Sequence, residues 1–213
     1  MTRLFCFTMV FVAVGMLTAS AWASIPYAPY STVVWNKASF GDDSVVVVCP
    51  KGDASYFDVT VKDQFNAPMA GVTVKVSVFP DATVPPRLVF CGVLTGLTNA
   101  SGYCRVGIKA GCNYTTAPIP YDPGAAAFLA GGVVVDCLSV VLFSDLSLKY
   151  YISPDSNASK KVMADDGTLF TNDWQRVLHN CHSNYNRTGL GTENVTNSAD
   201  GTVFSQHWQH ECP

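Results

Sequence analysis

The sequence has few charged side chains. Asp, Glu, Lys and Arg make up 14% of the 213 residues, and 16 acidic residues against 13 basic ones leave a formal net charge of −3. Domains that bind nucleic acid carry a clustered excess of Lys and Arg, so nucleic acid is excluded as an expected partner. Val, Thr, Ser and Gly are plentiful instead, which favours a β-rich fold over a helical bundle.

The motifs of common catalytic sites are also missing. The sequence contains no GxSxG elbow, no HExxH zinc motif and no phosphate-binding loop. No histidine precedes His179, so the β-rich part has none to activate a serine or cysteine nucleophile. The sequence also contains no CxxC pair, the motif typical of a redox site or a thiolate zinc knuckle. The sequence therefore predicts a protein that is not an enzyme.

Long apolar runs are scarce, and the one at the start of the chain has the form of a signal peptide. Arg3 precedes an uncharged run from Leu4 to about Leu17, and Ala21-Trp22-Ala23 matches the small-x-small cleavage pattern. The run is short for a membrane span of roughly 20 residues, and no cationic stop-transfer cluster follows it. We expect cleavage of residues 1–23, no membrane span in the mature chain, and a location outside the cell or on its surface.

The cysteines support an exported protein. The chain has eight, and removing Cys6 with the leader leaves seven. In an oxidising compartment most cysteines form disulfides. Because seven is odd, at least one thiol stays free or pairs with another chain.

The central part of the chain alternates apolar and polar residues with period two, as strands with one buried face do. In YFDVTVK the residues Phe57, Val59 and Val61 face one way, and Cys104, Val106 and Ile108 do the same further on. Strands are expected at residues 56–62, 72–78, 87–93, 103–109, 132–137, 138–143 and 146–152. Seven short strands with Gly, Pro and Asn between them predict a mainly β protein, with a β-sandwich over 44–152 after an N-terminal segment over 24–43.

Two stretches of this region resemble the bacterial immunoglobulin-like domains of invasin type. They are VTVKDQFNAPMAGVTVKVSV, with a turn from Asp63 to Val72, and GLTNASGYCRVGIKAG, with a strand start at Thr98 to Gly102. Asn66 stands where the family usually has Gly. The resemblance implies an immunoglobulin-like β-sandwich that acts as a spacer or adhesive module, without catalytic residues.

The last third of the chain contains an internal repeat. DGTLFTNDWQ at 166–175 recurs as DGTVFSQHWQ at 200–209, and each copy is followed by His-x-Cys. Within each copy the Phe and the Trp are four residues apart, which places both rings on one face of a helix. Residues 153–213 are therefore expected to form a separate small α-helical module of two loop-helix units.

The segment before the first copy has the spacing of a calcium loop, with oxygen ligands at its first, third, fifth, seventh and twelfth positions. Together with the duplication, this resembles a type I dockerin. The resemblance assigns calcium ligands in the first loop to Asp155, Asn157, Ser159, the carbonyl of Lys161 and Asp166, and in the second loop to Asn184, Asn186, Thr188 and Asp200. Lys160 stands in the position of a turn glycine, and Asp200 arrives five residues late. With few formal charges, any calcium should bind weakly.

The cysteines and histidines of the repeat suggest two further features. Cys181 and Cys212 end equivalent copies, and we expect them to bond to each other and close the module. The histidines His179, His182, His207 and His210 form two pairs, and paired histidines three apart can share a transition metal. An extracellular transition-metal-binding protein is therefore an alternative function.

The sequence as a whole predicts a secreted or cell-surface binding, adhesion or assembly protein, whose partner is an unidentified protein or glycan. A carbohydrate-binding or cell-wall-associated protein is a further alternative. It rests on aromatic residues that are expected to be exposed, namely Tyr27, Tyr30, Trp35 and Tyr121.

Overall fold

The structure is a computed structural model, which describes residues 24–38, 45–80, 88–112, 128–147, 149–174 and 198–213. The expected signal peptide lies outside these residues. None of the described helices is long and apolar enough to cross a membrane.

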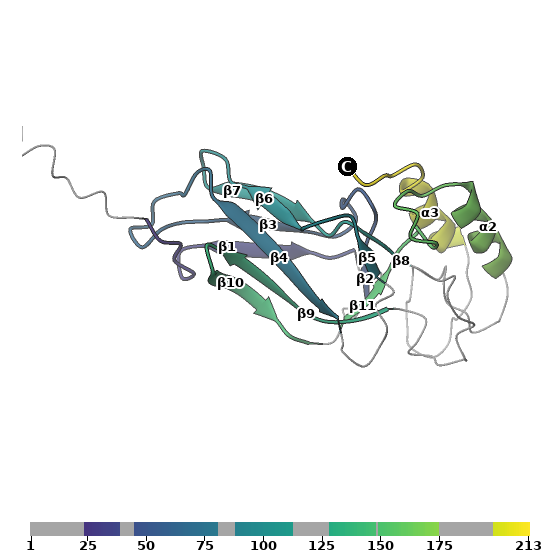
Figure 1. Cartoon of the computed structure of the whole chain (residues 1–213), viewed down its shortest axis with the longest axis horizontal. Coiled ribbons are helices and arrows are strands. Elements are labelled where there is room, and N and C mark those ends of the chain that lie inside the picture. The colour runs from purple at the N-terminus through teal and green to yellow at the C-terminus, as the bar shows by residue number, and fades with distance from the viewer. Residues whose placement is uncertain (1–23, 39–44, 81–87, 113–127, 148, 175–197) are drawn as a thin grey trace, which may run out of the picture.

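The fold is mainly β, as the sequence predicts (Figure 1). One sheet has three strands in the order β1 (Thr32–Asn36), β3 (Tyr56–Thr60) and β7 (Tyr103–Gly107). A larger sheet has the order β2 (Val45–Val47), β11 (Lys149–Ile152), β9 (Phe128–Cys137), β4 (Thr73–Pro80) and β6 (Thr95–Leu97), with β10 (Val140–Asp145) also paired to β9. A third, two-stranded sheet pairs β5 (Leu88–Phe90) with β8 (Ala110–Cys112).

The period-two pattern places the predicted apolar residues in one core between the sheets. Phe57, Val59 and Val61 are fully buried, and Val106 and Ile108 on β7 and just after it are buried as well. Val74, Val76, Val133 and Val135 supply the facing side from the larger sheet. Burial of one face of each strand is what holds the two sheets together.

The N-terminal segment contributes a strand to this sandwich. Along its whole length β1 pairs antiparallel with β3, from Thr32 opposite Thr60 to Asn36 opposite Tyr56. Trp35 stacks on Phe57, with 5.1 Å between ring centroids. The segment 24–43, which the sequence placed before the sandwich, thus supplies an edge of its smaller sheet.

The invasin-like turn leads from one sheet to the other, because β3 and β4 lie in different sheets. The Asp63 carboxylate accepts hydrogen bonds from the backbone N–H groups of Phe65 and Ala67, both at 2.9 Å. Asn66 has a φ of +63°, the left-handed conformation that the family pattern gives to Gly. This turn is therefore a corner between the sheets.

The C-terminal module packs against one end of the sandwich (Figure 1). It contains α2 (Ala164–Asp173) and α3 (Ser198–Gln206). A second cluster of buried side chains, here called the shared core, joins it to the sheets and consists of Val47 from β2, Ile152 from β11, and Val162, Val203 and Phe204 from the module. Apolar burial thus fixes the module on strands β2 and β11.

Candidate metal centres

The two helices of the module pack as equivalent partners. Phe170 and Phe204 stack on each other, with 5.1 Å between centroids. A methyl group at Gly167 would lie 3.7 Å from both Phe204 and Trp208, and one at Gly201 would lie 3.6 Å from Phe170 and 3.7 Å from Trp174. Each glycine therefore packs against the Phe and Trp of the other helix. The two copies of the sequence repeat make equivalent contacts with each other.

The first loop, residues 155–166, brings its two terminal carboxylates into the protein interior. Asp155 and Asp166 are both fully buried. Asp155 accepts hydrogen bonds from the backbone N–H groups of Ser159 and Lys160, both at 3.0 Å. Asp166 accepts them from Ser156 at 2.7 Å and from Met163 at 2.8 Å, and the latter bond closes the first turn of α2.

Charge accumulates in this loop. Burial and the neighbouring Asp166 raise the pKa of Asp155 to about 6. Burial also raises the pKa of Asp166. Within the described part of the chain, no Lys, Arg or His side chain forms an ion pair with either carboxylate. A bound cation would offset the repulsion between the two carboxylates and the cost of burying their charges.

The other expected ligands of the first loop lie around the same turn. Asn157 accepts a hydrogen bond from the Ser159 N–H at 2.8 Å, and the Ser159 hydroxyl donates to the Lys161 carbonyl at 2.8 Å. Lys160 has a φ of +71°, as the glycine position of a calcium loop requires. Two carboxylates and three neutral oxygen donors in one turn suit a hard cation, so the residues present fit calcium.

The second loop is described only at its end. Asp200 is fully buried in the first turn of α3. Asn184, Asn186 and Thr188 lie outside the described residues, and the calcium assignment there remains an expectation.

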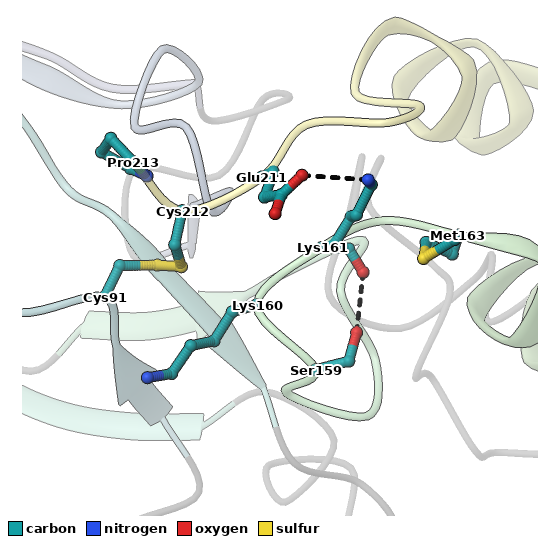
Figure 2. A pocket seen from close by; sticks show the side chains of 8 residues that line it. All are labelled: Cys91, Ser159, Lys160, Lys161, Met163, Glu211, Cys212 and Pro213. Atoms are coloured by element: carbon teal, nitrogen blue, oxygen red, sulfur yellow. Dashed lines mark hydrogen bonds and ion pairs between the residues drawn. A yellow bond between two sulfur atoms is a disulfide. The ribbon is translucent and has the colours of Figure 1, made fainter.

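The predicted Cys181–Cys212 disulfide is wrong, because Cys212 is bonded to Cys91 (Figure 2). Cys91 directly follows β5, and the two cysteines are 121 positions apart in the sequence. The bridge therefore ties the end of the chain to the sandwich instead of closing the module on itself. Cys181 lies outside the described residues.

A pocket beside this bridge shows how the chain end is held (Figure 2). Lys161 forms an ion pair with Glu211 at 2.9 Å, and the N–H of Cys212 donates to the Lys160 carbonyl at 2.9 Å. The middle of the first loop thus pairs with the last residues of the chain.

Four side chains of types that can ligate a metal meet close to the disulfide: Cys49, Asp53, His207 and His210, here called the four-donor cluster. Cys49 and Asp53 lie in the turn after β2, and the histidines lie in the turn after α3. One ligand-type atom from each residue lies within 4.8 Å of all the others. The cluster therefore takes two donors from the sandwich and two from the module.

Burial shapes the chemistry of these donors. Cys49 is fully buried, and burial together with its hydrogen bond to Asp53 raises the pKa of its thiol to about 11. Burial lowers the pKa of His207, which keeps its imidazole neutral. Asp53 is exposed and forms an ion pair with Lys51 at 3.0 Å.

The sequence drew attention to half of this cluster. Paired histidines marked His207 and His210, whereas His179 and His182 lie outside the described residues. Cys49 and Asp53 carried no signal of their own, because they lie more than 150 residues before the histidines and only the docking of the module brings them together.

The three described aromatic residues that were proposed for glycan binding lie in two different settings. Tyr27 and Tyr30 are exposed and touch edge to face, with 5.0 Å between centroids. Trp35 packs between Phe57 and Phe143 at the edge of the core. Tyr121 lies outside the described residues.

No known protein-family model matches the chain, and no curated protein matches it. Among solved structures the chain is similar to the Yersinia pseudotuberculosis adhesin InvE, with 17% identity and a TM-score of 0.33. The match covers 63% of this chain and 29% of the adhesin chain. A likeness of this extent assigns no function.

Proposed function

We propose that this chain is an exported, non-catalytic binding or assembly protein, in which an immunoglobulin-like sandwich carries a dockerin-like module organised by calcium. It acts outside the cell or on its surface, towards a protein or glycan partner. The observation that carries the proposal is the first loop, in which the carboxylates of Asp155 and Asp166 are buried beside neutral oxygen ligands.

Two further features support this function. The Cys91–Cys212 disulfide fits an oxidising compartment outside the cytoplasm. The module is anchored on the sandwich through the shared core, so calcium in the first loop would order a surface whose position on the sandwich is fixed. A module of fixed position and orientation suits assembly with a partner better than a freely tethered one.

Calcium titration of the mature chain, residues 24–213, tests the proposal. Calorimetry should record binding of calcium in the wild type, and calcium at about 100 times its Kd should raise the free energy of unfolding by about 2.7 kcal/mol. Asp155→Asn and Asp166→Asn should abolish both effects, because each removes one of two buried charges.

Asp165→Asn is the matched control. Asp165 is exposed and accepts a hydrogen bond from the Asn157 amide, so this variant should bind calcium nearly as the wild type does. A wild type that shows neither heat nor stabilisation at millimolar calcium would contradict a calcium-organised module.

A further inference from the structure

We propose that the four-donor cluster is a transition-metal site, best suited to Zn²⁺, that clamps the C-terminal module onto the sandwich. This site is separate from the first loop and does not depend on the calcium proposal. Thiolate, imidazole and carboxylate are the donors that zinc takes in proteins, whereas calcium takes oxygen alone.

The distances between the donor atoms approach the edges of a tetrahedron. Bond lengths of about 2.0 to 2.1 Å to N or O and about 2.3 Å to S imply edges of about 3.3 Å between N or O atoms and about 3.5 Å to sulfur. Cys49 Sγ lies 3.0 Å from Asp53 Oδ1 and 3.9 Å from His210 Nδ1. The two Nδ1 atoms lie 3.2 Å apart, and Asp53 Oδ1 lies 3.7 Å from that of His207 and 3.2 Å from that of His210. Small shifts of these side chains would place all four around one ion.

The charges also balance. On binding, the Cys49 thiol gives its proton to solvent and its sulfur bonds to the metal as a thiolate. Thiolate, carboxylate and two neutral imidazoles then surround a dication, which leaves no net charge beside the buried Cys49 and His207.

Asp53 is oriented by an ion pair with Lys51, and it connects the site to solvent. Its Oδ1 faces the other donors while Oδ2 accepts from Lys51, so the ion pair fixes the direction of the carboxylate. Because Asp53 is the exposed member, a metal ion can enter from its side.

The sandwich half of the site is held by a tight turn. The N–H of Gly52 donates to the Cys49 carbonyl at 3.0 Å, and Gly52 has a φ of +79°. A methyl group at Gly107 would overlap the Gly52 carbonyl, so two glycines let this turn lie flat against β7. Cys49 and Asp53 are therefore positioned before any metal binds.

The module half is fixed by Val162 in the middle of the first loop. The N–H of Gln209 donates to the Val162 carbonyl at 3.0 Å, and the N–H of Val162 donates to the His210 carbonyl at 2.9 Å. These bonds hold the turn that carries both histidines.

The odd number of cysteines agrees with this assignment. Seven cysteines after residue 23 cannot all pair. Cys49 is a free thiol, and Asp53, His207 and His210 around it are residues of types that ligate metals. A metal would also protect such a thiol from oxidation and exchange outside the cell.

Titration of the tag-free mature chain with Co²⁺, a spectroscopic substitute for Zn²⁺, tests the site. One equivalent should give the intense visible bands of tetrahedral cobalt and a thiolate-to-cobalt charge-transfer band, and one equivalent of Zn²⁺ should displace it. Cys49→Ser should lose the charge-transfer band, and His210→Gln should bind cobalt more than about tenfold more weakly, since even residues that only orient a ligand change affinity by about 10- to 100-fold.

Two controls separate this site from other donors. Cys104→Ala removes a different buried free thiol, and His182→Gln removes a histidine that follows the first repeat copy, so both should bind cobalt as the wild type does. Circular dichroism and mapping of the Cys91–Cys212 bridge should confirm that each variant is folded. If the wild type gives no thiolate band at one equivalent, or if folded Cys49→Ser keeps it, the proposal is overturned.

Discussion

At the scale of single residues, positive φ angles mark the turns on which both halves of the molecule depend. Asn66 and Lys160 adopt φ values of +63° and +71°. They stand at positions where the invasin-type turn pattern and the calcium-loop pattern have glycine. Such a conformation costs a residue with a side chain roughly 1 to 2 kcal/mol. The sequence identified both positions, because a family turn pattern specifies backbone conformation along with residue type.

Two glycines in the invasin-like motifs allow the cost of backbone strain to be measured separately from the cost of a steric clash. Gly71 and Gly102 both have positive φ, but a methyl group at Gly71 meets nothing within 4 Å, whereas one at Gly102 would lie 2.5 Å from the Val61 carbonyl oxygen. Gly71→Ala should cost about 1 kcal/mol of unfolding free energy from strain alone. Gly102→Ala should cost about 3 kcal/mol or more, because the clash adds to the strain. Urea unfolding of both variants measures the difference, and equal losses would contradict the packing described here.

Among the elements, strands with several alternating residues were predictable, whereas of the three-residue strands only β5, within the expected strand 87–93, was predicted. The alternation in residues 56–62 and 103–109 predicted β3 and β7, since a buried face repeats every second residue. The strands β6 and β8 have three residues each, too few to display a period. The sequence did not predict β1 either, because its alternation is weak and most of its residues are only partly buried.

Substitutions at Gly201 test how closely the two helices of the module pack. Ordinary contact distances of 3.6 to 3.7 Å leave room for a methyl group at Gly167 and Gly201. Gly201→Ala should therefore leave stability unchanged or raise it by up to about 1 kcal/mol, the difference in helix propensity. Gly201→Leu should destabilise the module, because a larger side chain must displace Phe170 or Trp174. Thermal unfolding measures both variants, and a strongly destabilising Gly201→Ala would show that the helices pack more tightly than described.

At the scale of the whole molecule, the sequence predicted two parts but not how they join. Local patterns predicted a sandwich and a duplicated module, and the first-loop ligands followed from spacing along one segment. The Cys91–Cys212 bridge and the four-donor cluster each draw residues from both parts, and no local spacing encodes such pairs. The shared core likewise joins Val47 and Ile152 to residues of the module. Sandwich and module therefore form one unit.

Differential scanning calorimetry of the mature chain, with its disulfide intact and with calcium and zinc present, tests the inference that sandwich and module form one unit. A single unit should unfold in one transition with equal calorimetric and van't Hoff enthalpies, because melting the module alone would expose Val47 and Ile152 and separate the halves of the four-donor cluster. Two separate transitions, with the helices lost in the first while the sheets persist, would contradict it.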